Sequence, residues 1–246
     1  MKIKTLRSFE GRLRRILYQR RHFPVDAVIE PFFEINHVIK NSGFGVSVQD
    51  ETVPTGSSNN VVSHRYENQM RTDADLEKIK YPVIEKDHER TEELLAIAVE
   101  VFDGTLDVKL NAPTPYLSIW DFISQIMPVE DVLFALIDRP EFMHELARRI
   151  SEGYLVALDQ LEEQGLLPHS QSLIHCTGAY VDELPKPGFD PNRPRCKDLW
   201  MFGLAQVFST VSPEMFEEFE VRYSSPICER FGVVYYGCCD PLDGKM

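Results

Sequence analysis

The stretch from residue 212 to residue 241 constrains the fold most, because it combines a complete helix with a buried strand. Ser212 suits the N-cap and Pro213 the first helical position, so the start of the helix is well defined. Apolar residues then recur at spacings of three and four, which predicts one core-facing stripe: Phe216, Phe219, Tyr223 and Ile227. We expect Pro226 to kink this helix and Gly232 to end it in a left-handed conformation.

A short apolar strand is expected next, at residues 233–236. Its sequence, VVYY, is apolar throughout and rich in β-forming residues, which is typical of a strand covered on both faces in a parallel sheet. Gly237, Cys238, Cys239 and Asp240 follow it. The carboxyl ends of parallel strands carry the chemistry of α/β folds, so this exit is the first candidate for a functional site.

Helical and apolar strand patterns alternate through the rest of the chain. The periodicity predicts helices at 6–21, 72–79, 85–102, 129–138 and 140–163, and strands at 25–33, 106–113 and 170–180. The first of these strands is expected to lead into a helical segment, and residues 44–66 to form a β-hairpin around the turn PTGSSNN. Residues 181–200 are rich in proline and charge, so we expect a long ordered loop there.

The alternation predicts a parallel α/β sheet. The chain contains neither GxGxxG nor a GxxxxGK motif followed by Ser or Thr, which argues against the usual dinucleotide-binding and P-loop sites. Its 246 residues, 43% of them hydrophobic, suffice for one α/β domain of about 250 residues. We therefore expect an α/β fold of the (β/α)8 TIM-barrel type in a single domain, with residues 1–66 as an N-terminal helix and hairpin region and residues 67–246 as barrel units.

Composition narrows the class of partner. The chain has 26 basic and 39 acidic residues and a net charge of −13, which disfavours nucleic acid and anionic membranes as partners. No apolar run approaches the roughly 20 residues that cross a bilayer, and five cysteines, an odd number, do not resemble a secreted disulfide framework. We expect a soluble cytoplasmic protein with reduced thiols and a small-molecule substrate.

Three polar residues outside the 212–241 stretch are candidates for a site. Glu30 interrupts an apolar run, where a carboxylate is either hydrogen-bonded structurally or part of a pocket as a catalytic group. His64 and Arg65 lie at the far end of the predicted hairpin. They suit the binding of a substrate carboxylate or phosphate, and they equally suit an ordinary charged hairpin surface.

Several motifs carry a family resemblance: HRYENQMRTDADLEKIKYP, DELPKPGFDP, CKDLWMFGLAQVFSTVSPEM and FGVVYYGCCDPLDGKM. Together they resemble the uroporphyrinogen decarboxylase superfamily, in particular its branch of decarboxylase-like proteins from anaerobic bacteria. The resemblance covers nearly the whole chain and implies a (β/α)8 barrel with its active cleft at the carboxyl ends of the strands. Members are longer than this chain, so we expect the barrel to be incomplete at its C-terminus.

The resemblance implies two chemistries. One is cofactor-free decarboxylation of porphyrinogen acetates, whose enzymes carry an N-terminal RQAGR motif that is absent from this sequence. The other is zinc-dependent methyl transfer between a corrinoid protein and a thiol, with an H-x-C pattern after one strand and a further cysteine after a later one. In this chain Tyr236 stands where the histidine of H-x-C would fall, and Cys238 matches its cysteine.

A substitute set of soft metal ligands consists of His175, Cys176, Cys238 and Cys239, from two strand exits of one barrel face. Buried, chemically inert cysteines and an ordinary polar histidine are the alternative, and we expect Cys196 and Cys228 to be structural. Asp240 is a candidate carboxylate base or partner of a metal ligand, and Tyr236 a candidate substrate contact.

Three functions remain open at this point. The first is zinc-dependent methyl transfer between a corrinoid or related methyl donor and a thiol, in which zinc lowers the pKa of the thiol. The second is a uroporphyrinogen decarboxylase-like lyase that acts on a polycarboxylate. The third is a non-catalytic barrel that binds a corrinoid or a partner protein.

Overall fold

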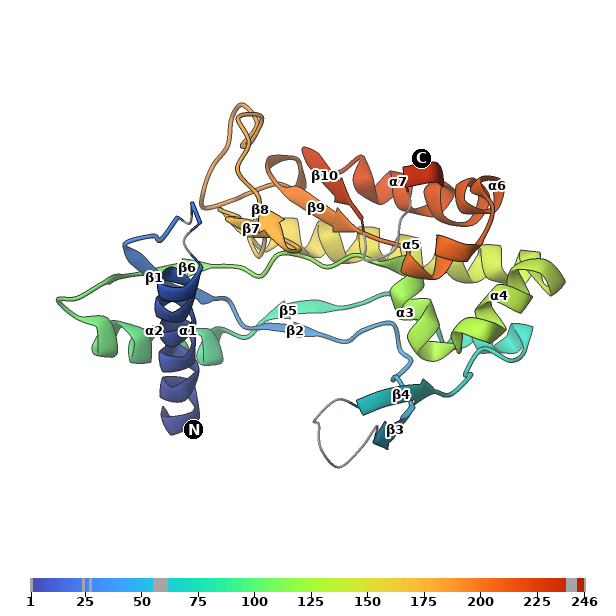
Figure 1. The fold of residues 1–246 in the computed structure, drawn as a ribbon, viewed down its shortest axis with the longest axis horizontal. Helices are drawn as coiled ribbons and strands as arrows, with labels where there is room; N and C mark the ends of the chain where they lie inside the picture. Colours follow the sequence, from blue (N-terminus) through green and yellow to red (C-terminus); the bar gives the residue numbers. More distant parts are fainter. Residues whose placement is uncertain (1, 24, 27, 55–61, 238–242, 246) are drawn as a thin grey trace. The chain divides into compact units, whose positions relative to one another are not determined.

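The computed structural model describes residues 2–23, 25–26, 28–54, 62–237 and 243–245. Contacts between residues group the chain into two compact units. Unit 1 contains Met1–Ile39 and Lys86–Pro113, and unit 2 contains Lys40–Glu85 and Thr114–Met246. The chain crosses from one unit to the other three times. Two crossings lie in the short strands β2 (Ile39–Asn41) and β5 (Ile84–Lys86), which are hydrogen-bonded to each other (Figure 1), and the third lies between Pro113 and Thr114.

Unit 1 packs two helices against a pair of parallel strands. Helix α1 spans Lys2–His22 and α2 spans His88–Phe102, while β1 (Phe32–Asn36) pairs in parallel with β6 (Asp107–Asn111). Its core is aromatic: the rings of Phe9, Phe33 and Phe102 contact one another with centroids 4.4–6.1 Å apart.

The helix predicted at 85–102 is confirmed as α2, and its start has a clear cause. The side chain of Asp87 accepts a hydrogen bond from the backbone N–H of Arg90 at 3.0 Å, which caps the first turn. The expectation for 25–33 was wrong in two respects. The strand begins at Phe32, and β2 follows it in the described chain where a helical segment was expected.

Unit 2 holds the larger core, which surrounds the fully buried Trp120. Its helices include α3 (Ile119–Ile126), α4 (Val129–Asp138) and α5 (Pro140–Glu163). The predicted bounds of α4 and α5 coincide with the observed ones. For α5 the cause is local, because Pro140 occupies its first turn and Gly165, with φ at +64°, follows its end. Helix α3 was not predicted.

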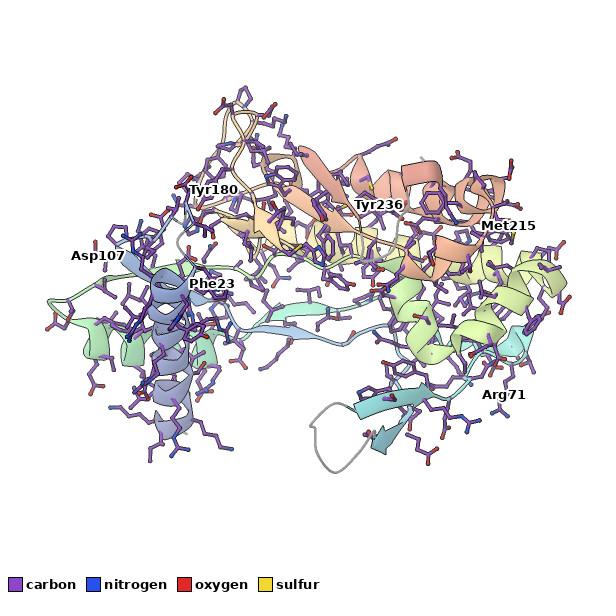
Figure 2. All side chains as sticks on the ribbon, viewed as in Figure 1. Phe23, Arg71, Asp107, Tyr180, Met215 and Tyr236 are labelled. Carbon is purple, nitrogen blue, oxygen red and sulfur yellow. The ribbon has the colours of Figure 1, made fainter. Side chains whose placement is uncertain are left out.

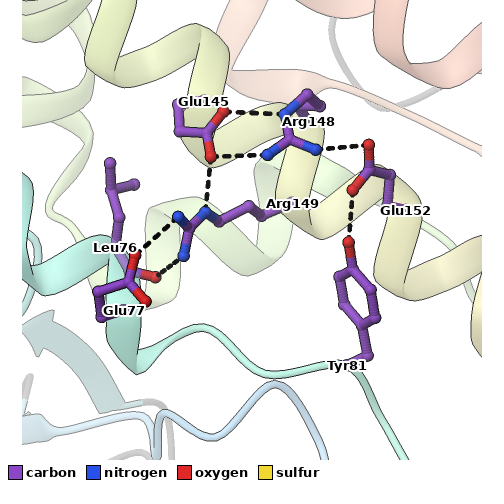
Figure 3. Close-up of polar contacts among 7 residues, drawn as sticks. All are labelled: Leu76, Glu77, Tyr81, Glu145, Arg148, Arg149 and Glu152. Carbon is purple, nitrogen blue, oxygen red and sulfur yellow. Dashed lines mark hydrogen bonds and ion pairs between the residues drawn. The ribbon is translucent and has the colours of Figure 1, made fainter.

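An ion-pair network joins α5 to the short helix η1 (Asp73–Lys78) and the segment after it (Figure 3). Glu145 pairs with Arg148 and Arg149 on its own helix, both at 2.7 Å. Arg149 reaches Glu77 of η1 at 2.8 Å, and Arg148 reaches Glu152 at 2.6 Å. Most of these charges are partly exposed, so the network fixes the orientation of η1 more than it adds stability.

Two parallel strands carry the C-terminal half of unit 2. Strand β9 (Trp200–Gly203) pairs with β10 (Val233–Tyr236), and they lie side by side in Figure 1. Tyr116 adds a parallel bridge to Phe202 on β9. The predicted strand at 233–236 is confirmed as β10, whereas β9 was not predicted.

The helix between these strands is interrupted. Ser212 caps α6 (Pro213–Phe216) by accepting a hydrogen bond from the N–H of Met215 at 3.2 Å, as predicted. A π-helical turn, η4 (Glu217–Val221), then leads into α7 (Arg222–Cys228), which contains Pro226. Gly232 does not adopt the expected left-handed conformation. It is required because a Cβ there would collide with the carbonyl oxygen of Lys197.

The predicted hairpin at 44–66 is present as β3 (Asp50–Pro54) and β4 (Val62–Tyr66), which pair antiparallel. The predicted (β/α)8 barrel is wrong. In the described residues the strands form five separate two-stranded sheets, among them the antiparallel pairs β3–β4 and β7–β8, so no closed ring of eight parallel strands exists. None of the described helices is both long and apolar enough to span a lipid bilayer.

Candidate functional site

The candidate metal ligands His175 and Cys176 lie at the tip of a tight hairpin. Strand β7 (Leu173–Ile174) pairs antiparallel with β8 (Thr177–Gly178), so His175 and Cys176 form a two-residue turn. His175 has φ at +50°, the left-handed region that such turns require and that a non-glycine residue adopts at a cost. The prediction of one strand with an exit loop at 170–180 was therefore wrong, but the two residues are presented together.

Aromatic side chains hold this tip against the two parallel strands. The imidazole ring of His175 is stacked on Phe202 of β9, with centroids 4.5 Å apart and planes 13° apart. It also lies 5.8 Å from the ring of Tyr235 on β10. Phe202 is only 9% exposed, so its ring is held in place by the residues packed around it. The hairpin tip thus meets the carboxyl-terminal ends of β9 and β10, although these segments are distant in sequence.

The two soft donors are close enough to share an ion. Cys176 Sγ lies 3.5 Å from His175 Nδ1, and both residues are exposed. Tetrahedral zinc, with Zn–S of about 2.3 Å and Zn–N of about 2.0–2.1 Å, separates a sulfur and a nitrogen ligand by about 3.6 Å. The observed pair fits this separation. Without a metal, the same distance allows a weak hydrogen bond between thiol and imidazole.

Two ligands do not complete a zinc site. In the part of the chain that the structure describes, no group of three or more His, Cys, Asp or Glu side chains is placed to hold a metal ion. The other predicted ligands, Cys238 and Cys239, and the predicted base Asp240 lie outside the described residues, directly after Gly237. Their place in the site stays a prediction.

The opposite face of β10 presents a buried carboxyl group. Successive side chains of a strand point to opposite faces, so Tyr235 faces His175 while Tyr236, labelled in Figure 2, faces the core. The Tyr236 hydroxyl donates a hydrogen bond of 2.7 Å to Glu220 Oε1. Tyr236 was predicted to contact substrate, and the structure puts it on the other side of the strand from the soft donors.

Glu220 is 2% exposed, and its Oε2 has no hydrogen-bond partner among the described residues. Burial raises the pKa of Glu220 to about 7, although the hydrogen bond from Tyr236 opposes part of this rise. The residue lies on the π-helical turn η4, a kind of helix defect that is frequent at functional sites. Around it, the indole N–H of Trp120 donates to the backbone oxygen of Phe219 at 3.2 Å.

Glu220 was missed from the sequence, yet a signal existed. It stands four residues after Phe216 and seven before Ile227, which puts a carboxylate on the apolar stripe of its helix. Phe202 was also missed, because no strand was predicted at β9.

His64 and Arg65 lie on β4, as the hairpin prediction required. His64 Nδ1 pairs with Asp50 on β3, and Arg65 stands opposite Glu51 in the strand register. Both residues line a cavity of about 920 Å³ together with Arg71. Acidic side chains, such as Glu130 and Asp131, line the same cavity. The contact of His64 and Arg65 with a substrate therefore stays a prediction.

Glu30 belongs to unit 1, whereas His175 and Cys176 belong to unit 2. Glu30 is exposed, so it is not the buried carboxylate that its apolar neighbours suggested. It lines a cavity of about 220 Å³ beside Arg12 and Arg20.

The remaining described cysteines are less accessible than Cys176. Cys196 is 1% exposed, and burial raises its pKa to about 12. Cys228 is half-buried, and burial raises its pKa to about 11. Both therefore remain thiols, whereas Cys176 is the exposed cysteine of the described set.

Comparisons with known proteins add no relative. No family model matches this chain, and no curated protein or solved structure matches it either. The resemblance to the uroporphyrinogen decarboxylase superfamily accordingly stays a prediction from sequence motifs.

Proposed function

We propose that this protein transfers a methyl group to a thiol at a zinc site on the hairpin tip between β7 and β8. The observation that carries the proposal is the 3.5 Å separation of Cys176 Sγ and His175 Nδ1 on an exposed turn. Sulfur and imidazole nitrogen are ligand types that suit zinc, and their separation matches a tetrahedral ion.

His175 and Cys176 would hold the ion, with Cys238 and Cys239 as the further ligands that the sequence predicts. When bound, zinc lowers the pKa of a coordinated substrate thiol and so makes a thiolate available near neutral pH. The methyl group then moves to the thiolate sulfur. A C–S bond forms while the bond between the methyl carbon and the donor breaks, and its electron pair stays with the donor.

The described residues contribute orientation and access. Stacking on Phe202 fixes the plane of the imidazole ring, so its Nδ1 is held beside Cys176. The exposed tip leaves room for a bulky donor such as a corrinoid, either free or bound to a protein. A corrinoid partner is part of the proposal because the sequence motifs imply it.

Metal content and activity test this function together. The full chain is purified without oxygen and assayed for zinc and for methyl transfer from methylcobalamin to 2-mercaptoethanol. We expect Cys176→Ser and His175→Ala to lose zinc and activity together. Cys228→Ser is the matched control, because Cys228 is half-buried and distant from the tip in sequence.

Each other outcome has a definite meaning. Full zinc occupancy in both tip variants would exclude this metal site. Zinc without methyl transfer would exclude the proposed reaction. Carbon dioxide release from uroporphyrinogen in the absence of methyl transfer would favour the lyase, and saturable cobalamin binding without turnover would favour a non-catalytic binding protein.

A further inference from the structure

A cavity lies at the base of the hairpin formed by β7 and β8, and it is separate from the proposed metal site. It has a volume of about 590 Å³, within the range of small-molecule pockets. Its lining comes from residues just before β7, just after β8 and at the start of β9, and it includes neither His175 nor Cys176. The cavity lies entirely in unit 2.

Trp200 is one of the lining residues, and hydrogen bonds hold it in a fixed position. The Trp200 Nε1–H donates to the backbone oxygen of Ala179 at 2.9 Å. The backbone N–H and C=O of Trp200 also pair with the side-chain amide of Gln171, at 2.8 and 3.1 Å. Three hydrogen bonds therefore hold Trp200 between the two arms of the hairpin. Tyr180, labelled in Figure 2, is 58% exposed and supplies a second aromatic ring at the rim.

The lining contains two carboxylates, Asp182 and Asp198, and one histidine, His169. No lysine or arginine is among its described lining residues. Asp198 is compensated, since Arg195 binds both of its oxygens at 2.7 and 2.8 Å. Asp182 is exposed, and within the described ranges the structure gives it no ion pair. It therefore leaves one uncompensated negative charge.

The net charge of unit 2 also favours a cationic ligand over an anionic one. Unit 2 contains 15 basic and 28 acidic residues in its sequence, so it carries the whole net charge of −13, while unit 1 has 11 of each. The net negative charge of the unit that contains the cavity disfavours an anionic ligand.

We propose that this cavity binds a small organic cation, an ammonium or sulfonium compound, between Trp200, Tyr180 and Asp182. Aromatic faces attract such cations through the ring quadrupole. Methyl-rich onium groups suit an aromatic wall better than a strongly hydrated metal ion does. Binding at this cavity does not require zinc, so it is tested independently of the proposed methyl transfer.

Choline and its neutral isostere 3,3-dimethylbutan-1-ol test the proposal. The chain has two tryptophans, and Trp120 is fully buried, so a ligand-dependent fluorescence change reports on Trp200. We expect saturable binding of choline that weakens as salt is raised. The isostere has the same shape without the charge, and we expect at least about fivefold weaker binding for it, which corresponds to about 1 kcal/mol.

Substitutions at the exposed rim then identify the site without removing core residues. Asp182→Asn and Tyr180→Leu should each weaken choline binding about fivefold. Glu183→Gln is the matched control, because Glu183 is adjacent and exposed but does not line the cavity. Equal affinity for choline and its isostere, no saturable binding of either, or unchanged binding in both rim variants would overturn the proposal.

Discussion

The two faces of β10 differ in their exposure and in the chemical groups that lie against them. On the Tyr235 face, two soft donors are exposed on a hairpin tip and supported by aromatic rings. On the Tyr236 face, a carboxyl group is sealed in the core with one oxygen lacking a partner in the described structure. Adjacent residues of one strand therefore serve different sites, and sequence proximity alone does not assign them to one.

The largest expected effect concerns the buried face. Glu220 has a pKa of about 7 in the folded chain and an ordinary value of 4.5 when unfolded. Between these values the folded state binds more protons than the unfolded state, so stability falls as pH rises and the loss is complete above about pH 7. Glu220→Gln removes this loss.

Unfolding in urea at pH 4 and pH 8.5 measures the effect. At pH 4 the variant and the parent should have similar free energies of unfolding. At pH 8.5 the variant should be more stable by roughly 3 kcal/mol, the equivalent of the shift in pKa. If the difference in free energy of unfolding between variant and parent were the same at both pH values, the pKa of Glu220 would not be raised by burial.

A smaller effect is expected from the partner of Glu220. Tyr236→Phe removes the hydrogen bond to Glu220. Above pH 7 the acceptor is a carboxylate, and the loss of stability should be about 1.5–3 kcal/mol. At pH 4 the acceptor is a carboxylic acid, and the loss should be about 1 kcal/mol. The pKa of Glu220 should rise in this variant, because the lost bond favoured ionisation. Tyr235→Phe is the control on the other face and should stay within about 0.5 kcal/mol of the parent.

His175→Ala tests how firmly the tip is held. Loss of the stacked ring should reduce stability by about 0.5–1.5 kcal/mol, because aromatic pairs contribute in this range. Urea unfolding at neutral pH measures it. If His88→Ala on α2, an exposed histidine for which the structure gives no ring contact among the described residues, had the same effect, the stacking on Phe202 would have no special role.

Cys176→Ser should have the smallest effect on stability, within about 0.5 kcal/mol, because the residue is exposed. Its consequence should instead appear in reactivity. In native protein treated with iodoacetamide, peptide mapping should find Cys176 labelled well before Cys196, whose thiol is buried. Simultaneous labelling of both would contradict the difference in exposure.

Local features of the fold were predictable where neighbouring residues determine them. Ser212 with Pro213 marked a helix start, and Pro140 with Gly165 bounded α5. Pairing between distant segments was not predictable, because alternating helices and apolar runs do not specify which strands meet. The barrel was inferred from that alternation, and the structure instead has separate strand pairs.

For the candidate site, residue types in the sequence indicated which side chains to consider, but the sequence did not predict how they are arranged in space. The sequence selected His175 and Cys176, but it did not show that they form a two-residue turn stacked on Phe202. Tyr236 was predicted as a substrate contact from its place at the strand exit, but the alternation of side chains along β10 puts it on the core face. Glu220 was not predicted, although its position on the apolar stripe of its helix is evident in the sequence.

The most direct test of the central claim, that the hairpin tip supplies metal ligands, is the visible spectrum of the protein loaded with Co²⁺ in place of zinc. The parent should show a thiolate-to-cobalt charge-transfer band that weakens in Cys176→Ser, with an altered ligand-field spectrum in His175→Ala and no change in Cys228→Ser. Spectra that are identical in the parent and both tip variants would contradict it.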